Sequence, residues 1–262
     1  NLTRPNIEIM AQNRGANWHG DFIKPTSARQ LLMIIEGGIM NTQTAYGQGV
    51  VSIPDNGSYN CSSITGSTSE LGNTSGRASK TINTKGDAST TETVDGKTAV
   101  SWRGTENPWG NIWKFVYGIN FYCTVDKPFG GYVCTDLNFA ESKNSGNYEN
   151  IGFTLPSANG YISAIGYSTK YDWLFLPSEV TGNSSLPVGD YYYQNNTWNG
   201  YRVALLGCNW NGWDDAGGFY WTLCNGVGSR DRSVGGRLVY IPTRDSATYT
   251  AAIEAWEQKM AA

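Results

Sequence analysis

A dense set of thiol, acidic, polar and aromatic side chains lies between Cys208 and Ser233, near the C-terminal end of the chain. Their spacing does not suit covalent chemistry. Asp214 and Asp215 are adjacent, so they do not flank one scissile bond, and Cys208 and Cys224 do not form a Cys-x-x-Cys pair. Chemically unrelated side chains carried on loops suit non-covalent recognition instead. We therefore assign ligand contact to Asn209, Asn211, Gly212, Trp213, Asp215, Tyr220, Thr222, Cys224, Ser229, Asp231 and Ser233.

An apolar and glycine-rich frame surrounds these positions. Residues 203–206 and 237–240 are β-type, and glycines between them permit tight turns. We expect these two segments to pair as strands and to hold the loops between them. The frame residues closest to the site are Trp210, Phe219, Trp221, Gly235 and Arg237, of which Trp221 is also a candidate for a large apolar contact.

This stretch resembles the variable region of diversity-generating retroelement proteins, especially those of bacteriophages and gut viruses. In that family an apolar run leads into Gly-Gly-Asn-Trp-Asn-Asn-Gly, then Ala-Gly-x-Phe-x-Trp, an Asn-rich loop and Ile/Val-Gly-x-Arg-Leu. The matching residues are Gly207, Asn209-Trp210-Asn211, Ala216-Gly217, Phe219, Trp221, Val234-Gly235 and Arg237-Leu238. The resemblance implies an α+β C-type lectin fold, related to that of formylglycine-generating enzymes, with short strands, one or two helices and long loop insertions.

The resemblance also implies a function. Adenine-directed mutagenesis in this family converts template Asn codons to codons such as those of Asp, Ser, Thr, Gly, Tyr, Cys or Val. The residues that fit that set are Asp215, Thr222, Cys224, Val227, Gly228, Ser229, Asp231 and Ser233. We expect a phage-tail or bacterial-surface adhesion protein whose 208–233 loop residues are diversified. Its expected partner is a protein or glycan receptor on a host cell, and we expect a homo-oligomer. The alternatives are a fixed carbohydrate-binding module and a structural virion protein.

The sequence motifs give little support for an enzymatic or metal-binding function. The chain has no Gly-x-Ser-x-Gly elbow, phosphate-binding loop or HExxH motif. Its single histidine, His19, has no identifiable triad or multi-His partners and is interpreted as structural. Calcium-dependent lectins of this fold use Glu-Pro-Asn or Gln-Pro-Asp and Trp-Asn-Asp. Here Glu106-Asn107-Pro108 and Trp213-Asp214-Asp215 depart from those patterns. We expect no catalysis, no cofactor and no metal in the site.

Composition sets further limits. The net charge is −3, so nothing draws the chain to nucleic acid, and no apolar run approaches the roughly 18–20 residues of a membrane span. Ten tryptophans and 32 glycines in 262 residues favour short strands with aromatic surfaces over a helical bundle. The chain begins at Asn1, and we expect an anchoring or assembly region to have preceded it.

The organisation follows from local patterns. We expect one lectin-like domain over 1–242, followed by a C-terminal helix within 243–262. Residues 1–17 predict an N-terminal strand or arm. Residues 24–42 predict a helix that is capped by Ser27, buries Leu31, Leu32, Ile34, Ile35 and Ile39, and ends or bends at Gly37-Gly38.

Two further segments have distinct compositions. Residues 54–96 are rich in Ser, Thr and Gly and predict a surface insertion. The run Trp102-Arg103-Gly104-Thr105-Glu106-Asn107-Pro108-Trp109-Gly110 resembles the same phage domains. It predicts either a packed corner, which we favour, or a stacked-tryptophan carbohydrate platform.

The remaining predictions concern cysteines and the C-terminal helix. Cys123 and Cys134 flank a turn-like 127–131, and we favour buried free thiols over a cross-hairpin pair. A final helix is predicted at 247–261, capped by Asp245 or Ser246. Its apolar residues recur on one stripe, which either packs on its own domain or forms a subunit contact; they are Tyr249, Ile253, Trp256 and Met260.

Overall fold

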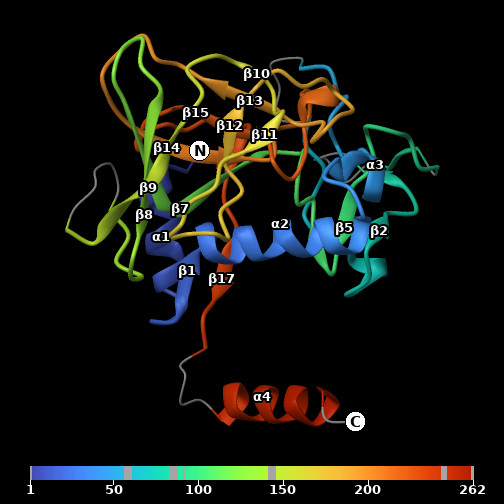
Figure 1. Ribbon diagram of the computed structural model, residues 1–262. Coiled ribbons are helices and arrows are strands. Elements are labelled where there is room, and N and C mark those ends of the chain that lie inside the picture. Colours follow the sequence, from blue (N-terminus) through green and yellow to red (C-terminus); the bar gives the residue numbers. More distant parts are fainter. Residues whose placement is uncertain are drawn as a thin grey trace.

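The fold combines few helices with a large curled sheet (Figure 1). The computed structural model describes residues 2–55, 61–82, 88–90, 92–140, 146–242 and 247–260. Over these ranges the helices are α1 (Arg4–Gln12), α2 (Ile23–Gly37), α3 (Thr42–Tyr46) and α4 (Ala247–Met260), with 3-10 turns η1 (Ser69–Leu71) and η2 (Trp213–Asp215). The predicted α+β class is confirmed.

The eight-stranded sheet carries most of the molecule. Its order is β10-β13-β15-β14-β7-β8-β9, and β16 pairs with β7. Pairing is antiparallel except for β13 with β15 and β16 with β7. The strands are β7 (Trp113–Cys123), β8 (Phe129–Cys134), β9 (Tyr148–Leu155), β10 (Gly160–Tyr161), β13 (Tyr191–Gln194), β14 (Gly200–Leu206), β15 (Trp221–Asn225) and β16 (Val234–Gly235).

Four small sheets surround the large one. They pair β1 (Trp18–Gly20) with β17 (Leu238–Tyr240), β3 (Thr81–Ile82) with β4 (Ala88–Thr90), and β11 (Ala164–Ile165) with β12 (Pro177–Glu179), and they join β2 (Gly76–Arg77), β5 (Val100–Trp102) and β6 (Thr105–Glu106). The expected pairing of 203–206 with 237–240 is therefore wrong. Residues 203–206 belong to β14, which pairs with β15 and β7, whereas β17 pairs with the N-terminal β1.

Strand β7 lies in the interior of the protein, and other parts of the chain pack against both of its faces. It is near-continuously apolar, and successive side chains point to opposite faces. Val116 packs in the main hydrophobic cluster, which includes Phe219 and Trp221, while Phe115 packs in a separate cluster with Ile7 from α1. This two-sided burial anchors the strands that carry the candidate site.

The N-terminal segment is a helix, which corrects the predicted strand or arm. Thr3 and Asn6 form a capping box, and Pro5 lies in the first turn of α1, where a missing N–H costs little. Ile7 and Ala11 of α1 are buried. The capping box and the proline favour the start of a helix more strongly than the short apolar run favours a strand.

Helix α2 is shorter than the predicted 24–42 helix. It ends at Gly37, and Gly38 follows with a left-handed φ of 69°, so the predicted glycine stop is confirmed. The chain re-enters a helix at α3, where the Asn41 side chain accepts a hydrogen bond from the Thr44 N–H at 2.9 Å. Ser27 is not the cap, because it lies buried inside α2.

The buried face of α2 also differs from the prediction. Leu31, Ile35 and Ile39 are 45%, 65% and 41% exposed, and Leu32 and Ile34 are only partly buried. The buried positions include the polar Thr26, Ser27 and Gln30. Ile23 and Met33 are buried as well, so the inward face mixes polar and apolar residues. Gln30 is accommodated there because its amide donates to the Gly218 carbonyl at 2.8 Å.

The tryptophan-rich corner is packed inside the protein. Trp102 is 3% exposed and Trp109 is fully buried, so a platform of stacked, exposed tryptophans is excluded for this pair. Cys123 and Cys134 are both buried free thiols, as predicted. His19 is also buried, with its Nδ1 2.9 Å from Glu8 Oε1, in line with a structural role.

The described parts of 54–96 contain short strands and turns with some burial. Cys61 and Ala78 pack in a small cluster with Trp210, so this segment supports the candidate site from one side. At the C-terminus, α4 lies apart from the sheet in Figure 1. Ile253 is the one residue of its predicted stripe with a described side chain, and it is 39% exposed. The predicted caps, Asp245 and Ser246, lie outside the described residues.

Candidate functional site

The segment between β14 and β15 is held by its main chain. At its start Gly207 has φ +92° and sits against Trp109, where a Cβ would come within 3.1 Å of the Trp109 Cα. Gly207 accepts a hydrogen bond from the Gly110 N–H at 2.8 Å and donates to the Tyr220 carbonyl at 2.9 Å. The close approach therefore requires glycine at this position.

Residues from outside the segment fix the rest of its backbone. The Gln43 amide donates to the carbonyls of Trp213 at 2.9 Å and Ala216 at 2.6 Å. Thr42 accepts from the Gly218 N–H at 2.9 Å, and the buried Asp190 accepts from the Phe219 N–H at 2.6 Å. Because these bonds use loop main-chain atoms, they do not depend on which side chains the loop carries.

Asp190 is the most deeply buried of these anchors. Its side chain is fully buried, and burial raises the pKa of its carboxyl well above the ordinary value, although the Phe219 N–H partly opposes this. No described residue hydrogen-bonds its Oδ1. Burial therefore favours the neutral form of the Asp190 carboxyl beside the loop.

Two loop residues adopt left-handed conformations. Cys208 has φ +68° and Trp213 has φ +48°. Such conformations disfavour most side chains and are adopted more readily by Gly and Asn. The backbone at these two positions therefore has a conformation that Gly or Asn would adopt with less strain than the Cys and Trp that are present.

An open hollow of about 360 Å³ lies beside this loop. Five of the residues assigned to ligand contact line it: Tyr220, Thr222, Cys224, Asp231 and Ser233. The remaining wall comes from the sheet and its neighbours, namely Trp113, Tyr193, Leu205, Asn225 and Val234. The fold therefore brings assigned residues that are distant in the sequence together around one hollow.

A row of aromatic rings runs from this hollow across the sheet. Trp113 meets Tyr220 edge-on with ring centroids 4.9 Å apart, Tyr220 lies 5.9 Å from Tyr191, and Tyr191 lies 5.1 Å from Tyr161. The Tyr161 hydroxyl then donates to Asp215 Oδ1 at 2.7 Å. The row links the hollow to η2 and gives a rigid apolar base with a polar end.

The rim of the hollow carries one exposed carboxylate, that of Asp231. The Ser233 hydroxyl and N–H both donate to Asp231 Oδ1, at 2.7 and 2.8 Å, and hold the pKa of that carboxyl below its ordinary value. The exposed Asp214 lines a different hollow, and burial raises the pKa of its neighbour Asp215. Asp231 is thus the one carboxylate among the residues that line this hollow, and it favours a ligand group that carries positive charge or hydrogen-bond donors.

The other assigned contact residues fall outside the hollow. Trp213 is 59% exposed at η2. The remaining ones are partly buried on the 209–215 loop or in a separate turn, and they are Asn209, Asn211, Gly212, Asp215 and Ser229. Tyr220 and Thr222 line the hollow but expose only 7% and 3% of their surface, so each presents only an edge to a ligand.

The residues assigned to the frame are mostly buried. Trp210, Phe219 and Trp221 expose 1% or less, which leaves Trp221 no room for the alternative role in ligand contact. A Cβ on Gly235 would meet Ile112 at 2.7 Å. Arg237 is partly buried and donates to the Glu106 carbonyl.

Four aromatic residues of the site were missed from the sequence: Trp113, Tyr161, Tyr191 and Tyr193. Alternation along β13 carried part of the signal. Tyr191 and Tyr193 share one face of the strand, whereas Tyr192 between them is fully buried. The parallel pairing of β13 with β15, which sets Tyr193 beside Thr222, is not visible in the sequence.

A second hollow, of about 250 Å³, lies on the other side of η2. Every residue that lines it is polar: Asn41, Gln43, Thr44, Gln48, Ser184, Ser185 and Asp214. Trp213, whose side chain is exposed, precedes the lining residue Asp214 in the chain, and its carbonyl accepts from the lining residue Gln43. The hydroxyl, amide and carboxylate groups of this wall match the hydrogen-bonding groups of a sugar.

Comparison with models of known protein families and with curated proteins finds no match for this chain. Over the described residues, no helix combines the length and the apolar character needed to cross a membrane. The described residues also contain no group of three or more His, Cys, Asp or Glu side chains placed to hold a metal ion.

Proposed function

We propose that this protein is a hypervariable ligand-binding protein, with a C-type lectin fold and loop residues at 208–233 that are diversified by a retroelement. It binds a protein or glycan receptor on a host cell surface, as part of a phage tail or a bacterial-surface adhesin. The mechanism is non-covalent. Apolar contact comes from the aromatic row and Trp213, and polar contact comes from the rim.

One observation carries this proposal: the loop is fixed through its main chain by residues outside it. Gln43, Thr42 and Asp190 bond loop carbonyl and N–H groups, not loop side chains. A scaffold of this kind tolerates many side chains at the loop positions while the backbone keeps its shape. The five assigned residues that line the hollow follow this held segment in the chain, from Tyr220 to Ser233, and their substitution changes the surface that a ligand meets.

Sequencing the DNA that flanks this gene, and the gene itself across its source population, tests the proposal. We expect a near-copy template repeat and a reverse transcriptase gene close by. We also expect substitutions concentrated between Cys208 and Ser233 at template adenines. Substitutions at Gln43, Thr42 and Asp190 serve as the internal control and should be rare. An invariant 208–233 stretch with no repeat would exclude diversification.

The second candidate function is a fixed carbohydrate-binding module, and the all-polar hollow beside Trp213 favours it. In this case Thr44→Trp, which fills the hollow, should abolish binding on a glycan array. Thr124→Trp, at an exposed position on a different loop, is the matched control and should leave binding unchanged. Equal glycan binding by the wild-type protein and Thr44→Trp would exclude this hollow as the sugar site.

A further inference from the structure

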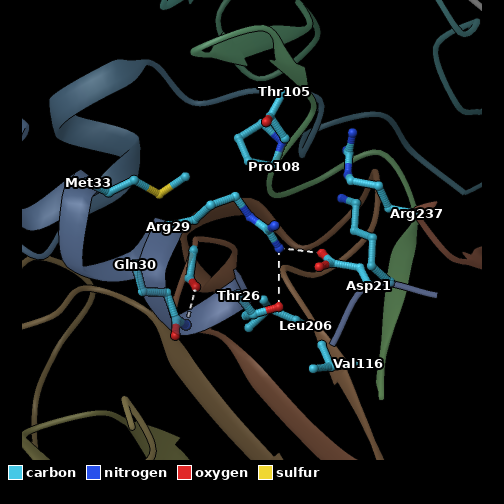
Figure 2. Close-up of a pocket in the computed structure, with 12 residues that line it drawn as sticks. Asp21, Thr26, Arg29, Gln30, Met33, Thr105, Pro108, Val116, Leu206 and Arg237 are labelled. Carbon is cyan, nitrogen blue, oxygen red and sulfur yellow. Dashed lines mark hydrogen bonds and ion pairs between the residues drawn. The ribbon is translucent and has the colours of Figure 1, made fainter. Parts of the chain in front are cut away.

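A small, partly open cavity lies between α2 and the start of β7, and Figure 2 shows the side chains that line it. Its volume is about 30 Å³. This volume can hold one or two water molecules or ions of similar size, since one water molecule needs roughly 10–15 Å³. The polar part of its wall consists of Asp21, Thr26, Arg29, Gln30, Lys114 and Arg237, and the remaining wall is apolar or glycine apart from Thr105.

The charges on this wall do not balance. Arg29 forms an ion pair with Asp21, the only carboxylate in the wall, as the dashed line in Figure 2 shows. Two basic side chains, Lys114 and Arg237, remain. Neither forms an ion pair with any described residue, and both donate hydrogen bonds to neutral carbonyls. Lys114 Nζ donates to Gly110 at 2.6 Å, and Arg237 donates to Glu106.

Both side chains have donors to spare. A lysine ammonium has three N–H donors and an arginine guanidinium has five, whereas each of these two side chains donates one hydrogen bond to the described residues. Lys114 is only 8% exposed, so bulk water does not solvate its ammonium group. Burial, and then the charge of Arg237, hold the pKa of Lys114 well below its ordinary value. Burying an unpaired cation is costly, and a nearby anion would offset that cost.

We propose that this cavity binds one chloride ion, held by the Arg237 guanidinium and by the Nζ donors of Lys114, whose ammonium form the ion would stabilise. The volume admits a monatomic anion and excludes sulfate or phosphate. A water molecule fits beside the ion and donates to Asp21 Oδ1, a buried oxygen without a hydrogen-bond partner among the described residues. The ion would bind α2 to β7 and to Arg237. This role is independent of the ligand that the loop recognises.

Crystals of the full chain soaked in sodium bromide test the site directly. Bromide replaces chloride and scatters anomalously, so we expect an anomalous peak in the cavity between Lys114 and Arg237. A cavity that contains only water density, without an anomalous peak, would overturn the proposal. This measurement uses the wild-type protein and does not depend on the folding of any variant.

Thermal unfolding tests the site in solution. At constant ionic strength, with gluconate replaced stepwise by chloride, Tm of the wild-type protein should rise by about 3–5 °C for each tenfold increase above the dissociation constant. Lys114→Met should abolish this dependence. Lys127→Met, at an exposed lysine remote from the cavity wall, should retain it. A wild-type Tm that does not respond to chloride would exclude a stabilising chloride site.

Discussion

Trp221→Ala is expected to lower the free energy of unfolding by about 3–5 kcal/mol, the usual cost of truncating a buried tryptophan. Trp221 is fully buried in the main hydrophobic cluster, and its Nε1 donates to the Phe175 carbonyl at 2.9 Å. The substitution opens a cavity under β15 and leaves that carbonyl without its partner. Urea denaturation followed by circular dichroism measures the change. A loss below about 1 kcal/mol would show that Trp221 is not part of the frame.

Trp213→Ala is the matched comparison, because this tryptophan lies in the same segment but is 59% exposed. Its free energy of unfolding should stay within about 0.5 kcal/mol of the wild-type value. Alanine keeps a Cβ in the same left-handed conformation, so backbone strain changes little. Affinity for the receptor should fall at least tenfold, about 1.4 kcal/mol, if Trp213 anchors the ligand. Unchanged affinity would remove Trp213 from the binding surface.

Asp190→Asn is expected to raise the free energy of unfolding at pH 7 by about 1–3 kcal/mol. The reason is the raised pKa of Asp190 in the folded state. Below about pH 3.9, the ordinary aspartate pKa, both the folded and unfolded chains carry the proton. As the pH rises through that value, the unfolded chain releases its proton while the folded chain keeps it, so stability falls until the folded-state pKa is reached. Asparagine is neutral throughout and removes this loss.

Urea denaturation of both proteins at pH 4, 5.5 and 7 measures the effect. The stability difference between Asp190→Asn and the wild-type protein should grow from pH 4 to pH 7. Asp190→Ala serves as the control, because it removes the acceptor of the Phe219 N–H and should cost about 1–3 kcal/mol. A difference that does not vary with pH would mean that Asp190 is ionised in the folded protein.

Local signals in the sequence predicted several elements well. The apolar run at 114–122 is β7, and the glycine stop at Gly38 ends α2. Trp210 and Phe219 were assigned to the frame, and both are buried. These features depend on propensity, side-chain size and the special conformations of glycine, which are properties of short stretches of chain.

Longer-range features were predicted poorly. The partner of β17 is β1, more than 200 positions earlier in the chain, and no local pattern specifies that pairing. The buried face of α2 was misjudged because its polar Gln30 bonds a carbonyl of the 207–220 segment. Apolar periodicity alone selects the face with Leu31 and Ile35, which the fold leaves exposed.

The sequence by itself determined the composition of the candidate site: a frame of glycine and large apolar residues that carries unrelated polar side chains between Cys208 and Ser233. Only the tertiary structure decided which of these residues meet. It placed Thr222, Asp231 and Ser233 around one hollow, and it added Trp113 and Tyr193 from other strands. The physical reason is that strand order and register bring distant segments together. Both are set by how the apolar faces of all the strands are buried in one sheet, which no single segment specifies.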